Sequence, residues 1–318
     1  MDKSHYLDLP EDFLKNLTSA FGRDATEDWL ARLPHLLADS ASRWDLEVGA
    51  PVDGLSYNYV CSAMRFPSPP ARGARGESQD CILKIGIPDR ELTSEMECLK
   101  AWGGLPNRPA VHLLECDPAN GLLLLERLRP GETLATLADE DRATEIAADV
   151  MSRLWIPAPE KQNFITLKGW FDELQKLRPR FNGGTGPFSV KLVETVESLL
   201  PNLFRENAPL YLIHGDCHHY NILSHGDEWR VIDPKGVVGA REYEIAPFML
   251  NPWFQKRDIK QQTARRLDIF SEQLGLDRQH LWAWTVAHSL LSAWWDMDEH
   301  GKGGEHSIAC GEAFLELG

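Results

Sequence analysis

The sequence lacks two features that would attach the protein to a membrane or export it. No apolar run approaches the roughly 20 residues that a membrane-spanning helix needs, and the first residues, Met1 to Tyr6, lack the basic start and apolar stretch of a secretion signal. We therefore expect a cytoplasmic protein.

Basic charge is also in short supply. The chain has 33 Lys and Arg against 48 Asp and Glu, which gives a formal net charge of −15. Nucleic acids and anionic membranes require clustered Lys and Arg, so neither is an expected partner. A small cationic substrate would be attracted to such a surface, although the acidity could also serve solubility alone. The sequence leaves the choice between a monomer and a homodimer open.

The six cysteines include no C-x-x-C pair, which argues against a disulfide framework and a zinc site. We expect them to be reduced and mostly buried. No P-loop occurs anywhere in the chain. With 318 residues, 43% of them hydrophobic and 25% charged, the chain is long enough for two globular lobes.

The first part of the chain is rich in predicted strands. Two helical patterns in residues 11–46, the second interrupted by Pro34, precede a strand-like region over 47–88. Within that region Pro67 to Ser78 indicates a long mobile hairpin loop. A helix is predicted over 91–103, followed by strands at Ala110–Cys116 and Leu122–Glu126.

The second part is mostly helical. Helical periodicity is found over Asp139–Trp155, Lys168–Leu177, Lys191–Phe204, Lys260–Leu274 and Leu281–Met297, with short strands near 210–213, 222–223 and 229–232. These patterns predict an α+β, two-lobed protein. Its N-terminal lobe, 1–127, would consist of a helical lead-in over 1–46 and a sheet with one helix, and its C-terminal lobe would span 128–318.

Two short loops in the second part carry the residues that phosphoryl transfer requires. His214-Gly215-Asp216 and Asn221 follow the apolar run Leu210–Ile213, and Asp233 follows Val231-Ile232. Phosphoryl transfer from ATP needs a carboxylate to accept the hydroxyl proton and oxygen ligands for Mg²⁺. Asp216 fits the first role, and Asn221 and Asp233 fit the second. Alternatively, Asp216 is a turn former and Asn221 is a cap.

Histidines surround Asp216, so a metal-hydrolase site is a further alternative. The adjacent pair His218-His219 would diverge, however, and His214 is better explained as an anchor of the loop through hydrogen bonds.

Lys84 lies within the predicted strand Cys81–Ile87, where a lysine is costly to bury without a partner. It either faces solvent or contacts ATP phosphates while paired with a carboxylate. Glu95 and Glu97 on the next helix are the candidates, and only one of them can face inward. Glu95 is favoured because it shares a stripe with Leu99.

The residues match those of a known family. The matching segments are Ala110–Leu114, Leu123–Glu126, Thr144–Ala148, His214–Ile222, Ile232–Gly239 and Leu291–Trp295. Here the chain resembles the aminoglycoside phosphotransferase family, and most closely its streptomycin 6-phosphotransferase and hydroxyurea phosphotransferase branch.

The resemblance implies a protein-kinase-like fold in which ATP and two Mg²⁺ ions are held between the lobes. It puts the catalytic base on Asp216, metal ligation on Asn221 and Asp233, and phosphate contact on Lys84. Adenine contact falls on the backbone near Glu126 and Leu128.

We therefore expect an ATP- and Mg²⁺-dependent kinase for a hydroxyl on a small polar cation such as streptomycin, or for hydroxyurea. Two alternatives stay open. One is a kinase for a metabolite such as choline, homoserine or a sugar amine, and the other is a nucleotide-binding protein of the same fold without activity.

Overall fold

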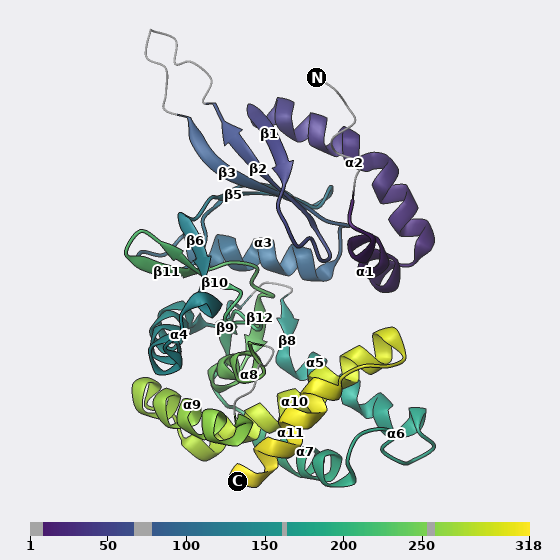
Figure 1. The fold of residues 1–318 in the computed structure, drawn as a ribbon, viewed down its shortest axis with the longest axis vertical. Coiled ribbons are helices and arrows are strands. Elements are labelled where there is room, and N and C mark those ends of the chain that lie inside the picture. Colours follow the sequence, from purple (N-terminus) through teal and green to yellow (C-terminus); the bar gives the residue numbers. More distant parts are fainter. Residues whose placement is uncertain (1–8, 67–77, 161–163, 253–257) are drawn as a thin grey trace. The chain divides into compact units, whose positions relative to one another are not determined.

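The chain divides into two compact units, each described here by itself. A computed structural model describes residues 9–66, 78–160, 164–252 and 258–318 (Figure 1). Unit 1 comprises residues 1–103 and 111–128, and unit 2 comprises residues 104–110 and 129–318. The short stretch 104–110 groups with unit 2, where Ala110 forms a parallel β-bridge with Val231.

Unit 1 is a five-stranded antiparallel sheet with helices. Its elements are α1 (Glu11–Phe21), α2 (Arg23–Arg43), β1 (Leu46–Pro51), β2 (Tyr59–Arg65), β3 (Gln79–Ile85), α3 (Arg90–Gly103), β4 (Leu113–Asp117) and β5 (Leu122–Glu126). The strand order is β1-β2-β3-β5-β4. The predicted loop Pro67–Ser78 falls largely on residues 67–77, outside the described residues, but β2 and β3 on either side pair in register from Arg65–Gln79 to Tyr59–Ile85.

Helices α1 and α2 bury an apolar stripe against one face of this sheet. The stripe includes Phe13, Leu17, Trp29 and Leu33, all at most 3% exposed, in one core with strand residues such as Leu83. The predicted interruption at Pro34 is wrong, because α2 continues through it without a break. Packing of the flanking apolar side chains offsets the one backbone hydrogen bond that a proline removes.

Alternation along β3 explains the place of Lys84. Cys81, Leu83 and Ile85 are fully buried in the core with α1 and α2. Successive side chains of a strand point to opposite faces, so Lys84 points to the other face of the sheet. On that face it meets Glu95 of α3.

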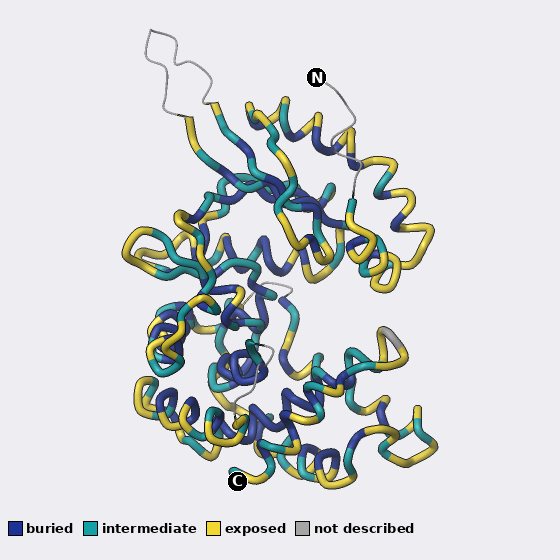
Figure 2. The backbone as a smooth tube through the Cα atoms, in the orientation of Figure 1, coloured by how far each residue is buried: buried dark blue, intermediate teal, exposed yellow. Residues whose placement is uncertain are grey.

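Unit 2 is built mainly from helices. Its helices are α4 (Glu140–Leu154), α5 (Leu167–Asp172), α6 (Leu177–Arg180), α7 (Val190–Leu203), α8 (Ala246–Met249), α9 (Ile259–Leu274), α10 (Arg278–His300) and α11 (Glu305–Phe314). Single-turn 3₁₀ segments occur at Leu134–Thr136, Glu173–Lys176, Arg241–Ile245 and Leu315–Leu317. Helix α10 is buried along most of its length, packs against α7, α8, α9 and α11, and forms the centre of this unit (Figure 2).

Short strands carry the loops of interest in unit 2. They are β6 (Pro130–Thr133), β7 (Ile156–Pro157), β8 (Ile165–Thr166), β9 (Tyr211–Ile213), β10 (Ile222–His225), β11 (Glu228–Val231) and β12 (Val237–Gly239). They form two small sheets, of order β11-β10-β6 and β7-β9-β12-β8. The 214–221 loop runs from β9 to β10, and residues 232–236 run from β11 to β12, so each loop joins the same two sheets.

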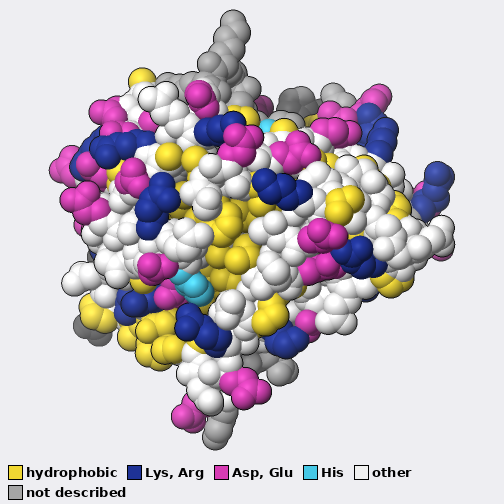
Figure 3. Space-filling view, turned by 90° about the horizontal axis from the view of Figure 1, so that it is seen from below, with side chains coloured by type: hydrophobic (Ala, Val, Ile, Leu, Met, Phe, Trp, Pro, Cys, Tyr) yellow, Lys and Arg dark blue, Asp and Glu magenta, His cyan; other side chains and the backbone are white. Residues whose placement is uncertain are grey.

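All six cysteines are free, and five of them are buried, as the sequence predicted. Among the described helices, none combines the length and apolar character that crossing a bilayer requires. On the face shown in Figure 3, hydrophobic side chains gather in the middle, with Lys, Arg, Asp and Glu side chains around them.

Candidate active site

The 214–221 loop starts at a buried strand. Leu212 and Ile213 of β9 are fully buried, and β9 pairs with β12 through Ile213–Val237 and Leu212–Val238. An apolar strand inside a sheet holds its own end in place. The loop that follows can therefore present polar side chains from a rigid base.

His214 ties the two loops together. Its Nδ1 accepts a hydrogen bond from the Asp216 N–H at 3.2 Å, so the proton lies on Nε2, which donates to the Ile232 carbonyl at 2.9 Å. The His214 carbonyl accepts from the Lys235 N–H at 2.8 Å. Complete burial lowers the pKa of His214 to about 3, so the ring is neutral. These bonds make His214 an anchor rather than a metal ligand.

Glu244 holds the same loop through its backbone, a contact that the sequence analysis did not predict. This carboxylate is fully buried and accepts the His214 N–H at 2.8 Å and the Gly215 N–H at 2.9 Å. Burial raises the pKa of Glu244 to about 7, although the two N–H bonds act in the opposite direction. Glu244 lies in an irregular 3₁₀ segment, where no periodic pattern marks the side chain that turns inward.

Asp216 and Asn221 lie together. The Asn221 amide nitrogen donates to the Asp216 carbonyl at 2.9 Å and lies 3.5 Å from Asp216 Oδ2. The Asp216 side chain is one-third exposed, and its Oδ1 lies 3.6 Å from His218 Nε2. The structure thus brings a partly exposed carboxylate next to a primary amide, five residues apart in the chain.

The pairing of strands β10 and β11 places Asp233 next to Asn221 in the structure. Strands β10 and β11 pair Ile222 with Val231, and the Ile232 N–H donates to the Asn221 carbonyl at 3.0 Å. Asp233 therefore follows directly after the residue that is bonded to Asn221. The residue before a proline usually adopts extended geometry, but Asp233, which precedes Pro234, has a φ of +59°. The bonds of Ile232 and Lys235 to the 214–221 loop turn the chain at this point and hold the strained conformation.

Lys84 and Glu95 form a buried ion pair within unit 1. Lys84 Nζ lies 2.6 Å from Glu95 Oε2, and the two side chains are 7% and 5% exposed. Glu97, the other candidate, pairs instead with Lys100 at 2.8 Å. A buried pair of this kind costs desolvation free energy, so its presence calls for a reason beyond stability.

The backbone N–H of Glu126, at the end of β5, already has a hydrogen-bond partner. That group donates to the His112 carbonyl at 3.0 Å, and the Glu126 side chain accepts the His112 N–H at 2.9 Å. Leu128 is buried. An adenine contact at this segment would therefore use main-chain groups other than the Glu126 N–H.

The family of the chain follows from a sequence match. The model of the aminoglycoside/hydroxyurea antibiotic resistance kinase family matches residues 68–301. The chain belongs to this family. It is therefore a phosphotransferase of the small-molecule kinase class, and its α+β fold is kinase-like.

Individual members of the aminoglycoside/hydroxyurea kinase family match over most of the chain. The streptomycin 6-kinase of Streptomyces glaucescens is 29% identical over 308 residues, which is 94% of both chains. The hydroxyurea phosphotransferase of Kitasatospora aureofaciens is 28% identical over 287 residues, which is 88% of this chain and 77% of that protein.

The fold is shared more widely. A choline/ethanolamine kinase family protein from Mesorhizobium loti superimposes with a TM-score of 0.61 at 13% identity, over 90% of this chain and 94% of that chain. At this identity the likeness concerns the fold alone.

The donor atoms of the Asp216–Asn221–Asp233 group suit a hard cation. Both side-chain bonds of Asn221 use its amide nitrogen, which leaves the amide oxygen as a ligand atom. Carboxylate and amide oxygens are preferred by Mg²⁺, which takes few protein ligands.

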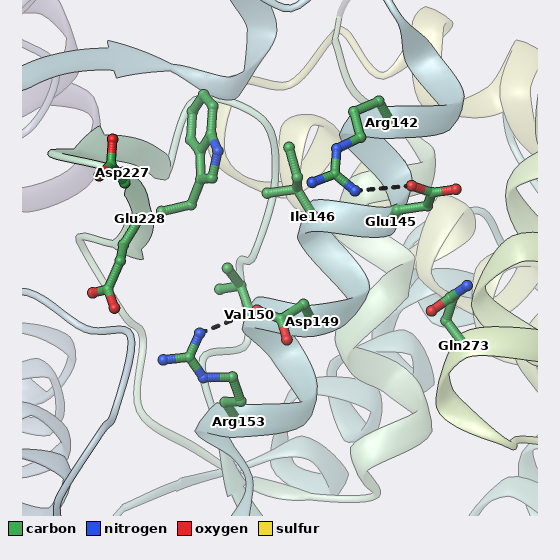
Figure 4. Close-up of a pocket in the computed structure, with 10 residues that line it drawn as sticks. Arg142, Glu145, Ile146, Asp149, Val150, Arg153, Asp227, Glu228 and Gln273 are labelled. Carbon is green, nitrogen blue, oxygen red and sulfur yellow. Dashed lines mark hydrogen bonds and ion pairs between the residues drawn. The ribbon is translucent and has the colours of Figure 1, made fainter.

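A cavity of about 480 Å³ lies elsewhere in unit 2, between α4 and the β10–β11 hairpin (Figure 4). Four of its charged side chains pair with each other, Arg142 with Glu145 at 3.0 Å and Arg153 with Asp149 at 3.1 Å. None of the residues predicted for the active site lines it.

Proposed function

We propose that the protein transfers the γ-phosphate of ATP, in the presence of Mg²⁺, to a hydroxyl of a small polar molecule. Streptomycin is the first candidate acceptor and hydroxyurea the second. The observation that carries this proposal is the linked group in unit 2, in which Asn221 bonds to Asp216 and to the residue before Asp233. Family membership supports the type of reaction.

Asp216 is proposed as the base. Its carboxylate accepts the proton of the acceptor hydroxyl as the hydroxyl oxygen bonds to the γ-phosphorus. The bond from that phosphorus to the bridging oxygen of the β-phosphate breaks, and ADP leaves. The bond from its own N–H to His214 and the amide of Asn221 hold Asp216 in place, so little reorganisation is needed at the moment of reaction.

The remaining roles follow the donor chemistry of each residue. Asn221 and Asp233 are proposed to hold Mg²⁺, which supplies positive charge to the phosphates when bound. Lys84, oriented by Glu95, is proposed to contact the α- and β-phosphates. The adenine is proposed to meet the main chain at Glu126 and Leu128. In these terms residues 1–127 are the nucleotide-binding lobe, and residues 128–318 are the catalytic and substrate-binding lobe.

An acceptor screen tests the proposal. The protein is incubated with ATP, Mg²⁺ and either streptomycin, hydroxyurea or choline, and the products are analysed by mass spectrometry. We expect streptomycin to gain the mass of one phosphate group, and we expect no product when EDTA removes the metal. Phosphate on neither streptomycin nor hydroxyurea would contradict the proposed substrates.

A further inference from the structure

An indole lies directly beside the residue that precedes Asp216. Gly215 has a φ of +86°, and a Cβ added there would come within 3.2 Å of the Trp170 ring and 2.6 Å of Val237. Gly215 thus allows the 214–221 loop and the Trp170 ring to approach closely. Trp170 is half-buried on α5, a helix that starts where β8 pairs with β12.

Trp295 extends the aromatic surface. Its ring, from α10, packs edge-on against Trp170 with centroids 5.2 Å apart and an interplanar angle of 82°. It is half-buried as well. Two buried side chains pack against these indoles, and the Tyr243 hydroxyl and His288 Nδ1 are hydrogen-bonded to each other at 2.8 Å. The ring centroids of Tyr243 and Trp170 are 6.3 Å apart, and those of His288 and Trp295 are 6.4 Å apart. Each indole therefore packs against one member of this buried, hydrogen-bonded Tyr243–His288 pair.

The same helix end already binds a guanidinium group within the protein. The Arg180 guanidinium lies 6.0 Å from the ring of Trp294 and 3.3 Å from the carboxylate of Asp298. An indole face next to a carboxylate attracts planar cations through the ring quadrupole and through charge. Glu299 follows Trp295 by four residues, as Asp298 follows Trp294, and side chains four residues apart lie on the same face of a helix.

The one lysine on the helix that carries Trp170 is paired with a carboxylate. Lys168 on the same helix is bonded to Asp172 at 2.7 Å, so it opposes a cation only weakly. Over the whole chain, the net charge of −15 favours the approach of a cation.

We propose that Trp170 and Trp295 form the acceptor-binding surface and that this surface selects a molecule with a guanidinium or ammonium group. The inference rests on the function proposed above and narrows it. Streptomycin, which carries two guanidinium groups, fits such a surface. Hydroxyurea is neutral and gains nothing from a cation–π contact.

Substitution of each indole tests the inference. The variants are Trp170→Leu and Trp295→Leu, with Trp170→Phe and Trp295→Phe to restore a ring. Trp229→Leu serves as the matched control, because Trp229 is also half-buried in unit 2 but lines the cavity beside α4. Streptomycin binding is measured by calorimetry, and KM and kcat are measured separately for streptomycin and for ATP.

Each Leu variant should bind streptomycin about tenfold more weakly, as the loss of one desolvated cation–π contact predicts. The KM for streptomycin should rise by a similar factor, with the KM for ATP unchanged. The Phe variants should recover most of the affinity, and Trp229→Leu should match the wild type.

The outcomes separate the two proposals. If the wild type phosphorylates streptomycin and the Leu variants bind it equally well, the aromatic surface is wrong and the function stands. If the wild type does not bind streptomycin but phosphorylates hydroxyurea, the cationic acceptor is wrong and the enzyme class stands. Failure with both acceptors would overturn both proposals.

Discussion

Glu244 holds the start of the loop that carries Asp216. Its two oxygens each accept a backbone N–H of the 214–221 loop, at 2.8 and 2.9 Å. Charge on a fully buried carboxylate is costly, and this cost raises its pKa from 4.5 to about 7. A group whose pKa is higher in the folded state stabilises that state below its unfolded pKa. This contribution is lost as the pH rises through the folded pKa.

The variant Glu244→Gln should therefore change the pH dependence of stability. Between pH 4.5 and 7, the wild type should lose about 3 kcal/mol of unfolding free energy relative to the variant, because the amide cannot titrate. Urea unfolding across this range measures the difference, and the contributions of other titrating groups cancel in it. Parallel stability curves for the two proteins would show that Glu244 does not titrate there.

Residues differed in how far the sequence alone could predict them. The pairing of Lys84 with Glu95 rather than Glu97 was predicted from the apolar stripe that Glu95 shares with Leu99, which is a local pattern of one helix. Glu244 and the positive φ of Asp233 were not predicted, because contacts between residues about 10 to 30 positions apart produce them, and neither residue lies in an α-helix or a strand.

At the scale of elements, Arg266 joins parts of unit 2 that are distant in sequence. From α9 its guanidinium donates to the Phe248 and Asn251 carbonyls at 3.0 and 2.6 Å, and to Glu140 of α4 at 2.8 Å. It also lies 3.3 Å from His219 of the 214–221 loop, whose ring stacks on Phe248 with centroids 3.8 Å apart. The packing of α4, α8 and α9 is thus coupled to the loop that carries Asp216.

Replacement of Arg266 by Met should lower the unfolding free energy by about 3 kcal/mol, because buried acceptors lose their donor. Arg265→Met is the matched control. Its side chain is 56% exposed and pairs with Asp141 at the surface, so its loss should cost about 0.5 kcal/mol. Urea unfolding compares the two variants. Equal stabilities would mean that Arg266 does not hold these elements together.

Elements with a clear apolar period were predicted well, and the exceptions have physical reasons. The sequence indicated α3, α4, α7, α9 and α10 to within a few residues. Helix α2 was expected to break at Pro34, but its buried stripe of Trp29, Leu33 and Leu37 outweighs the local cost of proline. Strands β7, β8 and β12 have only two or three residues each, too few for an alternation to be visible.

At the scale of the whole molecule, the protein consists of two compact units and carries a net charge of −15. Unit 1 holds the buried Lys84–Glu95 pair, and unit 2 holds the linked Asp216–Asn221–Asp233 group. Membership in the aminoglycoside/hydroxyurea kinase family assigns the chain to the phosphotransferases. The central claim of the proposed function is that Asp216 accepts the proton of the acceptor hydroxyl.

Turnover by Asp216→Asn tests this claim most directly. The asparagine has nearly the same shape but cannot accept the proton, so kcat for streptomycin should fall about 10³-fold, with the Kd for ATP within about twofold of the wild type. Asp227→Asn, an exposed aspartate at the turn between β10 and β11, should keep the full rate. Wild-type turnover by Asp216→Asn would contradict the account.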